Sequence, residues 1–400
     1  MTLPLILLSL CVLAFAAAAV VYWQIRRRHM DRWIVPYILQ TPKRHRPRRG
    51  PVHVLLCIAD HFEPKQGDLR PGAGREALER WLDEYPKKFG NFRDSDGYPP
   101  RHTFFYPEEE YEPDYLNSLA NLCREGFGEV EIHLHHDNDT ADGLRRKLVA
   151  FRDLLAERHG LLSRDRRTGQ VRYGFIHGNW ALDNSLPDGR WCGVNNELDI
   201  LRETGCYADF TLPSAPSPAQ TRKINSIYYA VDDPARPKSH DRGVDVGTGP
   251  EPERALMLVQ GPLVLDWRRR SHGILPRIES GNLQQGQPPD LHRLDAWMRA
   301  HVQVPGQPSW YFIKLHAHGL KPANTPMMLG EPMQSFHEAL KRRAAEDPQF
   351  HFHYVTAREM YNLVRAGEAG FPGRVDEVRE FCLVRDASFT RPGIPAVAIC

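Results

Sequence analysis

Histidine and aspartate side chains recur in this sequence where short apolar stretches end. They are Asp60, His61, His133, His135, His136, His177, His316 and His318. Imidazole and carboxylate groups bind Zn²⁺ and other first-row divalent ions, and the same groups accept and donate protons in hydrolysis. A single histidine at the end of a strand is usually a hydrogen-bonded structural residue. Its recurrence after four apolar stretches favours a shared metal site.

The segment from Glu129 to His135 alternates charged and apolar residues, which is typical of a β-strand. The alternation places Glu131, His133 and His135 on one face of that strand. Two imidazoles on the same face, two residues apart, can reach one ion. His135 and Asp139 are four residues apart, and a loop that folds back after the strand would let this pair bind the ion instead. The spacing leaves both ligand sets open.

Strand-like and helix-like segments alternate after residue 50, with Gly, Pro and Asn between them. Expected strands span 52–59, 101–106, 129–135, 171–176, 208–212, 255–265, 310–315 and 350–355. Expected helices span 76–88, 115–126, 140–157, 196–204, 291–302, 335–345 and 356–364. Six to eight strand and helix units favour an α/β barrel of parallel strands over an open sheet, and in such a barrel the strand ends share one face. Residues 213–250, rich in Pro and polar residues, are expected to form a long irregular loop.

The N-terminus carries an uncharged apolar stretch over residues 3–23. As a helix it would cross a hydrocarbon core of about 30 Å. Only two residues precede it, which favours a single-pass membrane anchor over a cleaved signal peptide. Because Arg26, Arg27 and Arg28 follow, the positive-inside rule predicts that the rest of the chain is cytoplasmic, with a periplasmic location as the alternative.

Residues 24–50 hold nine basic residues and one acidic residue, with aromatic residues between them. This pattern predicts contact with anionic membrane lipid headgroups, and a solvated linker is the alternative. The whole chain has a net charge of only +2, which gives no indication of a nucleic-acid partner. We therefore expect four parts: an anchor (1–25), a basic juxtamembrane linker (26–50), a catalytic barrel (51–368) and a C-terminal extension (369–400).

Four segments with these histidines occur in the order expected of the polysaccharide deacetylase superfamily (NodB-like, carbohydrate esterase 4). They are IADHFEP, EVEIHLHHDND, FIHGNW and FIKLHAHG, and FHYVTAREMYNLV resembles the closing strand and helix of that family. The resemblance covers about residues 51–365. It implies a distorted (β/α) barrel that removes an acyl group, usually N-acetyl, from a sugar with the help of a divalent metal ion, for which Zn²⁺ is expected.

The resemblance also implies roles for single residues. Asp60 stands at the position of the general base, and His61 stands where the family has a second acid that binds the metal. Glu63 would compensate for this lost anionic ligand. The second motif implies metal ligands at His135 and Asp139, or at His133 and His135 instead.

The third motif of the family carries an arginine that orients the base, and this chain has His177, Asn179 and Trp180 there instead. We expect these three residues to contact the substrate. The last motif implies that His316 is the general acid, with His318 as its alternative and as a further substrate contact. The implied mechanism is metal-assisted hydrolysis, in which Asp60 takes a proton from water and His316 gives one to the leaving amine.

Two other functions remain open from the sequence. The H-x-H pattern at a strand end also occurs in amidohydrolase-type metal hydrolases. The departures from the deacetylase motifs also fit a catalytically inactive, membrane-tethered barrel that binds carbohydrate. The expected substrate is a lipid-linked or nucleotide-linked sugar for a cytoplasmic enzyme and an exported polysaccharide for a periplasmic one.

Overall fold

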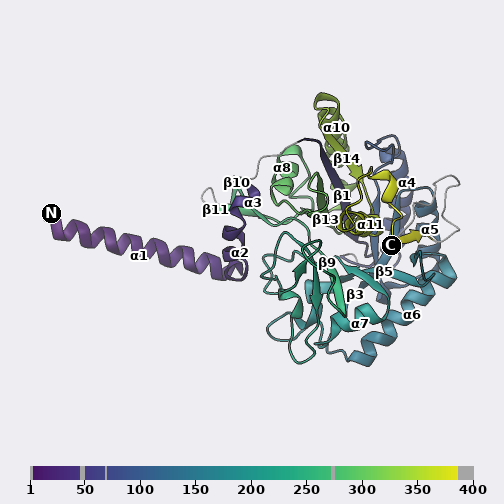
Figure 1. Cartoon of the computed structure of the whole chain (residues 1–400), viewed down its shortest axis with the longest axis horizontal. Coiled ribbons are helices and arrows are strands. Elements are labelled where there is room, and N and C mark those ends of the chain that lie inside the picture. Colours follow the sequence, from purple (N-terminus) through teal and green to yellow (C-terminus); the bar gives the residue numbers. More distant parts are fainter. Residues whose placement is uncertain (1–2, 46–49, 68–69, 272–274, 386–400) are drawn as a thin grey trace.

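The computed structural model describes residues 3–45, 50–67, 70–271 and 275–385, and Figure 1 shows a long N-terminal helix that projects from a rounded body. This helix, α1 (Leu3–Arg27), is long and apolar enough to cross a membrane, and its residues from Leu7 onward are not buried against the body. Its length and composition fit a membrane span or a signal sequence.

The body is an α/β fold built on one large, mostly parallel sheet. Its parallel strands are β1 (Val52–His61), β2 (His102–Pro107), β3 (Gly128–Leu134), β5 (Val171–His177), β6 (Cys206–Asp209), β9 (Ala255–Val259), β12 (Asn282–Leu283), β13 (Trp310–Ala317) and β14 (Phe350–Tyr354). The strand order is β12-β13-β1-β2-β3-β5-β6-β9-β7-β8, and β14 pairs with the first half of β1. The prediction of an α/β fold with parallel strands is confirmed.

Helices follow most of these strands. They are α4 (Ala73–Phe89), α5 (Pro113–Arg124), α6 (Ala141–His159), α7 (Glu197–Glu203), α8 (Leu291–Arg299), α9 (Thr325–Met328), α10 (Glu331–Glu346) and α11 (Ala357–Glu368). Two of these helices begin next to the residues expected from the sequence, because a side chain caps the first turn of each. Thr140 caps α6 by accepting a hydrogen bond from Gly143 N, and Thr356 forms a capping box with Glu359 at the start of α11.

The sheet is strongly curved. Lys314 on β13 donates a hydrogen bond of 2.7 Å to the Phe210 carbonyl oxygen at the end of β6, although four strands separate β13 from β6 in the sheet. Strands about 4.8 Å apart would place these residues far beyond the reach of a lysine if the sheet were flat. The curvature agrees with a barrel-like sheet, and it brings the ends of distant strands together.

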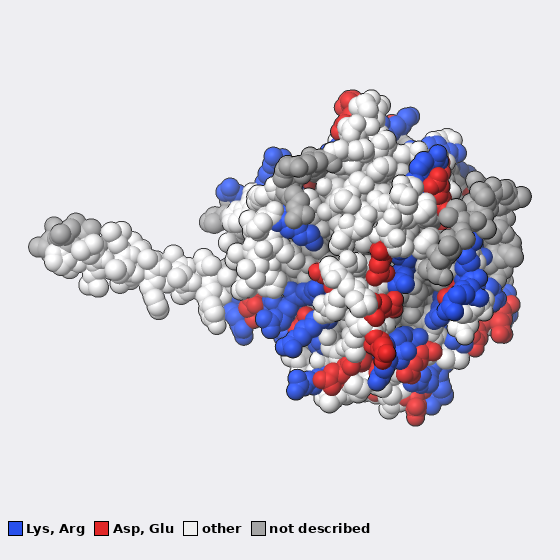
Figure 2. All heavy atoms as spheres, in the orientation of Figure 1, with Lys and Arg blue, Asp and Glu red and all other residues white. Residues whose placement is uncertain are grey.

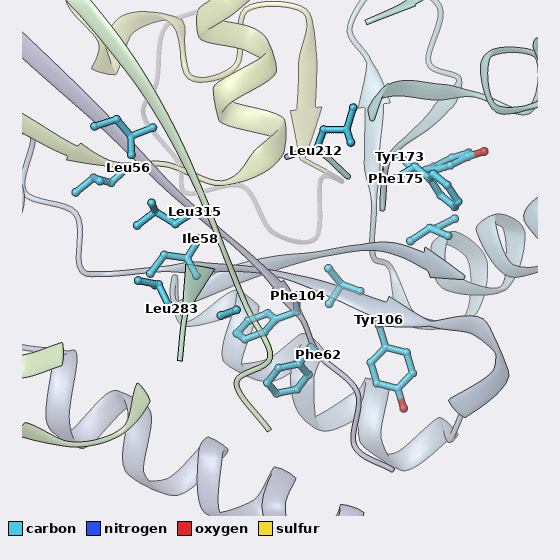
Figure 3. Packing of buried hydrophobic residues seen from close by; sticks show 14 of the residues in the cluster. Leu56, Ile58, Phe62, Phe104, Tyr106, Tyr173, Phe175, Leu212, Leu283 and Leu315 are labelled. Atoms are coloured by element: carbon cyan, nitrogen blue, oxygen red, sulfur yellow. The ribbon is translucent and has the colours of Figure 1, made fainter. Parts of the chain in front are cut away.

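The two faces of the sheet bury different side chains. On β1, Val54, Leu56 and Ile58 pack with α4, α5 and α6, and we call this the outer face. The alternate residues Leu55 and Cys57 pack on the inner face, which α11 covers in part. Figure 3 shows outer-face side chains from several strands meeting in one cluster. The expected alternation on β3 is confirmed, because Val130, Ile132 and Leu134 all belong to the outer cluster.

Residues 26–45 fold against the body. They form α2 (Ile34–Leu39) and α3 (Thr41–Arg44), and Trp33 is fully buried with Met30 and Leu263. Leu265 N donates to the Tyr37 hydroxyl at 3.1 Å, and Gln40 donates to the Ile224 carbonyl at 2.9 Å. Basic side chains gather on the body beside the base of α1 (Figure 2). The segment expected to be a linker is therefore packed against the body in this region.

Three parts of the fold differ from the sequence expectations. Residues 213–250 are not wholly irregular, because β7 (Ile227–Val231) pairs antiparallel with β9 and with β8 (Val244–Asp245). The strand expected over 255–265 is broken after β9, and β10 (Val264–Ser271) leaves to pair with β11 (Leu275–Glu279). In the C-terminal extension, β15 (Leu383–Arg385) pairs with β4 (Ser163–Asp165), and residues 386–400 lie outside the described residues.

Candidate metal centre

Glu63 lies at the centre of a group of histidines at the carboxyl ends of β1, β3 and β13. We call the group of His61, Glu63, His133, His135 and His318 the Glu63 cluster. Glu63 Oε1 lies 3.2 Å from His133 Nε2 and 3.2 Å from His135 Nε2, and Glu63 Oε2 lies 3.8 Å from His318 Nε2. The ligand atoms of His61, Glu63 and His133 lie within 4.8 Å of one another. The structure thus brings together residues from three strand ends, as the sequence predicts.

The cluster has a buried floor and an accessible rim. His61, Glu63 and His133 are buried, whereas the side chains of His135 and His318 are 30% and 22% exposed. The imidazole of His318 stacks on that of His61, with ring centroids 4.5 Å apart. His135 and His318 therefore form the exposed side of the cluster.

The protonation of the floor favours a cation. Burial lowers the pKa of His61 well below its usual value, which leaves a neutral imidazole. Burial alone would raise the pKa of Glu63, but hydrogen bonds with His133 and His135 outweigh it and lower this pKa to about 2. His133 Nδ1 donates to the Ile176 carbonyl oxygen at 2.9 Å, and Nε2 faces Glu63 Oε1 at 3.2 Å, so both contacts fix the orientation of the ring.

Glu109 extends the cluster at its exposed side. Its carboxylate accepts a hydrogen bond from His135 Nδ1. Burial alone would lower the pKa of His135, but the hydrogen bonds to Glu109 and Glu63 outweigh burial and raise this pKa to about 10. Glu109 could not be predicted from the sequence, because it lies in a short 3₁₀ turn (Glu108–Glu110) with two other glutamates.

Asp60 does not join the Glu63 cluster. It follows Ile58 on the outer face of β1, and its side chain is fully buried. Gly319 N donates to Asp60 Oδ1 at 2.7 Å, and His102 Nδ1 donates to Asp60 Oδ2 at 3.1 Å. Because both oxygens are occupied in the packing under α4, the geometry gives no support to Asp60 as the general base.

Asp139 also lies apart from the partners of His135. Its Oδ2 pairs with Lys147 at 2.8 Å and lies 3.4 Å from His136 Nδ1, whereas His135 contacts Glu63 and Glu109. The structure therefore does not support the pair of His135 and Asp139 as ligands of one ion. The alternative set, with His133 and His135 on one face of β3, agrees with the geometry.

His316 lies on the inner face of β13, two residues before His318. It is buried, and burial lowers its pKa well below the usual value, with the charge of Lys314 as a further cause. Its Nδ1 has no hydrogen-bond partner among the described residues. His316 thus lies behind the cluster, and His318 occupies the exposed position next to it.

The structure separates His177 from Asn179 and Trp180, the three residues that we expect from the sequence to contact the substrate. His177 is fully buried and lies 3.6 Å from Glu197, so a substrate cannot contact it. Asn179 and Trp180 follow in a 3₁₀ turn and are partly exposed. The intervening Gly178 packs on His135, since a Cβ at this glycine would lie only 2.3 Å from His135 Cδ2. Asn179 and Trp180 therefore remain candidates for substrate contacts beside the rim.

Comparisons with known proteins give no family for this chain. No protein-family model matches it, and no curated protein matches it. The crystal structure of a 4-alpha-glucanotransferase from Thermococcus litoralis is similar over 78% of this chain, with 12% sequence identity and a TM-score of 0.38. This chain covers 40% of that enzyme's chain. A likeness this distant carries no argument about activity, which must rest on the Glu63 cluster.

Proposed function

We propose that this chain is a metal-dependent hydrolase that removes an acyl group from a sugar, and the motif resemblance implies that this group is N-acetyl. The observation that carries the proposal is the arrangement of four histidines around the buried carboxylate of Glu63, with two of them at an exposed rim. A closed structural site would not need an accessible side, whereas a catalytic ion needs a free position for water and substrate.

The residues present fit a divalent cation. Glu63 Oε2 is buried and has no hydrogen-bond partner among the described residues, and His133 Nε2 lies 3.2 Å from the other oxygen of the same carboxylate. In the proposal His61, Glu63 and His133 hold the ion, and Zn²⁺ suits two imidazoles and a carboxylate. A bound ion would supply Lewis-acid chemistry, by polarising the acyl carbonyl and lowering the pKa of water.

His135 is the proposed proton carrier. Its Nδ1 donates to Glu109, which fixes the ring and turns Nε2 toward Glu63. Because the hydrogen bonds to Glu109 and Glu63 raise the pKa of His135 to about 10, this ring is protonated and can give a proton to the leaving amine. Burial lowers the pKa of His318, on the other side of the floor, and this neutral ring is placed to hold the substrate or to accept a proton from water.

The substrate and its location are proposed from the sequence motifs and from α1. A sugar is expected from the deacetylase-like motifs, and Asn179 and Trp180 lie where they can contact its ring. We further propose that α1 anchors the chain in a membrane with the body on the cytoplasmic side, in contact with anionic lipid. Such a body would meet lipid-linked or nucleotide-linked sugars.

An amidohydrolase-type activity is the second candidate. It is favoured by the convergence of two H-x-H patterns, since His133 and His135 meet His318 of the second pattern at Glu63. Both activities share the ion and the proton carrier, and they differ in the acyl compound that is cleaved. A panel that includes simple N-acyl amides without a sugar separates them.

The test is acetate release by the full-length protein, purified in detergent with Zn²⁺, from N-acetylated sugars and from simple N-acetyl amides. The wild-type protein should release acetate from a sugar, and His133→Ala should reduce the rate at least about 100-fold because a ligand is lost. His351→Ala, a change at a histidine outside the cluster, is the matched control and should keep the wild-type rate. No release from any acylated compound would refute the proposed activity and favour the inactive carbohydrate-binding barrel.

A further inference from the structure

A second group of metal-binding side chains lies apart from the Glu63 cluster. It consists of His136 after β3, His177 at the end of β5, Cys192 in the loop before α7, and Glu197 at the first residue of α7. We call these four residues the Glu197 cluster. All four are buried, and their ligand atoms lie within 4.8 Å of one another.

We infer that the Glu197 cluster binds a second divalent metal ion, best matched by Zn²⁺, which has a structural role. Two imidazoles, a thiolate and a carboxylate form a complete tetrahedral ligand set for zinc. All four positions would be filled by protein, so this ion would have no open position. The inference does not depend on the activity proposed for the Glu63 cluster.

The three contacts of Glu197 have the lengths expected for edges of a zinc tetrahedron. Glu197 Oε1 lies 3.3 Å from His136 Nε2 and 3.6 Å from His177 Nε2, and Glu197 Oε2 lies 3.4 Å from Cys192 Sγ. Bonds of about 2.0 to 2.3 Å at tetrahedral angles place ligand atoms about 3.3 to 3.6 Å apart. The other ligand pairs lie within 4.8 Å, so small side-chain shifts would bring all four ligand atoms to this spacing.

His177 is oriented as a metal ligand. Its Nδ1 donates to the Gly178 carbonyl oxygen, so its Nε2 carries a lone pair. This Nε2 points at the cluster, is fully buried, and has no hydrogen-bond partner among the described residues. A buried nitrogen lone pair that faces a carboxylate oxygen needs a cation or a proton between them.

The surrounding groups are those that support a zinc site. The backbone N–H groups of Asn184 and Val194 point at Cys192 Sγ, at 3.3 and 3.4 Å, and such donors stabilise a thiolate. The His136 Nδ1 faces Asp139 Oδ2 at 3.4 Å, which is the carboxylate support common behind a ligating histidine. Asp139, expected from the sequence to bind a metal, would thus act behind a ligand of this second ion.

A third group of potential metal ligands differs from the Glu197 cluster because it is paired with a basic side chain. Asp94, Asp96 and His353 also lie close together, but Arg379 pairs with Asp94 at 3.4 Å and with Asp96 at 2.8 Å. In that group the guanidinium of Arg379 already balances the charge of the carboxylates. Among the described residues no Lys or Arg forms an ion pair with Glu197, so its buried negative charge is left to the two histidines and a metal.

The second ion would hold in place the loop that packs beside His135, at the exposed side of the Glu63 cluster. The loop between β5 and α7 holds several residues in the left-handed region, among them Asp183 and Asn184 with φ of 54° and 52°. Metal bonds from Cys192 and Glu197 to His136 and His177 would tie this loop to β3 and β5. Because Gly178 packs directly on His135, the second ion would also position the proposed proton carrier.

The test is X-ray absorption at the zinc edge on the full-length protein in detergent, loaded with Zn²⁺. The Glu63 cluster has no cysteine, so a sulfur neighbour at about 2.3 Å reports the second site alone. In the variant His61→Ala/His133→Ala, which removes ligands of the first site, the remaining zinc should show about one sulfur ligand. Absence of a sulfur neighbour in both this variant and the wild-type protein would overturn the inference.

Cys192→Ser should remove the sulfur signal, and Cys206→Ser, at a buried cysteine of β6 outside the cluster, should keep it. If Cys192→Ser does not fold, Co²⁺ substitution of the wild-type protein decides the question. A thiolate-to-cobalt charge-transfer band supports the inference, and a spectrum without this band contradicts it. A sulfur signal in a protein that releases no acetate would leave the second site standing and refute only the proposed activity.

Discussion

Asp60 and His61 are neighbours in the chain, but their side chains leave β1 on opposite faces. His61 joins the Glu63 cluster on the inner face, and Asp60 is fixed under α4 by His102 and Gly319 N. The rings of Trp81 and Tyr85 lie against His102, with centroids 5.3 and 5.1 Å away. We therefore interpret Asp60 as a structural residue that holds the end of β1.

This interpretation makes Asp60→Asn informative. The change replaces charge-assisted hydrogen bonds in the packing, and we expect it to cost about 1.5 to 3 kcal/mol of unfolding free energy. The rate of acetate release per folded molecule should stay within about threefold of the wild-type rate. Thermal unfolding and kcat measured on the same preparation check both parts. Loss of kcat with an unchanged melting temperature would restore Asp60 as the general base.

Gly178 is a second residue where a small change should have a large effect. A Cβ at this position would lie 2.3 Å from His135 Cδ2 and 2.6 Å from His135 Cγ, so Gly178→Ala must displace either the ring or the turn. We expect kcat to fall at least about tenfold, since a misplacement of about 1 Å in a catalytic group can cost more than this. Gly286→Ala, where a Cβ meets nothing within 4 Å, is the control. Equal kcat values for the two variants would contradict the claim that Gly178 positions His135 for catalysis.

The residues that could be predicted from the sequence are those on regular strands. His133 and His135 follow from the alternation of β3, and His61 and His318 follow from their positions after apolar strands. Glu109, Cys192 and Glu197 could not be predicted, because they reach the two clusters from loops and from a helix start. The pattern of polar and apolar residues does not indicate the direction in which the side chains of an irregular segment point.

At the scale of elements, α8 is held to β11 by a buried ion pair. Arg293 Nη2 lies 2.8 Å from Glu279 Oε1, both side chains are almost fully buried, and Trp297 donates to the same carboxylate at 2.9 Å. Burial alone would raise the pKa of Glu279, but the hydrogen bonds and charge of Arg293 outweigh burial and lower it. Arg293 also donates to the Asn282 carbonyl oxygen of β12 at 2.7 Å, and β12 pairs with β13, which carries His316.

The pair predicts a defined dependence of stability on pH. Because the pKa of Glu279 is lower in the folded protein than in the unfolded chain, its stabilising contribution is present above the unfolded pKa of about 4.3. This contribution is lost as the pH falls through the folded pKa. Glu279→Gln should destabilise the protein by about 3 to 5 kcal/mol at pH 7, since Arg293 is left buried without its partner.

Thermal melting of the wild-type protein and Glu279→Gln between pH 7 and pH 3 measures this effect. The difference in melting temperature should shrink toward the acid end. Glu346→Gln, at an exposed glutamate of α10, should match the wild-type protein throughout. A difference that stays constant over the whole range would contradict the assigned role of the carboxylate charge.

Most elements followed from local signals, and the exceptions have a physical cause. Apolar stretches bounded by Gly, Pro or Asn marked β1, β2, β3, β5 and β13 correctly. The strand β7 was missed because its partner β9 is distant in the sequence and its flanks are rich in Pro and polar residues. The stretch over 255–265 was read as one strand, whereas Gly261 and Pro262 separate β9 from β10.

At the scale of the whole molecule, the curved sheet explains how a dispersed set of residues forms two adjacent sites. The contact from Lys314 to Phe210 closes the inner face, and the strand ends that carry the histidines are brought to one side. The sequence could indicate parallel strands from the repeated units. It could not indicate the packing of residues 26–45, because the burial of Trp33 depends on Ile224 and Leu263, far along the chain.

This packing gives the N-terminal helix a defined relation to the body. α1 leads directly into η1 (Met30–Arg32) and α2, and Arg28 donates to the Pro276 carbonyl at 3.1 Å. If α1 spans a membrane, the body is held close to the lipid surface and not on a free tether. The proposed substrate pool, lipid-linked or nucleotide-linked sugars, agrees with this placement.

The central claim is that His61, Glu63 and His133 hold a divalent ion, and metal content tests it most directly. Full-length wild-type protein, His61→Ala/His133→Ala and the control His351→Ala would be purified with Zn²⁺, dialysed and analysed by mass spectrometry. The account predicts that the double variant contains one ion per chain fewer than the wild-type protein and the control. A wild-type protein without a stoichiometric ion, or equal metal content in all three proteins, would contradict it.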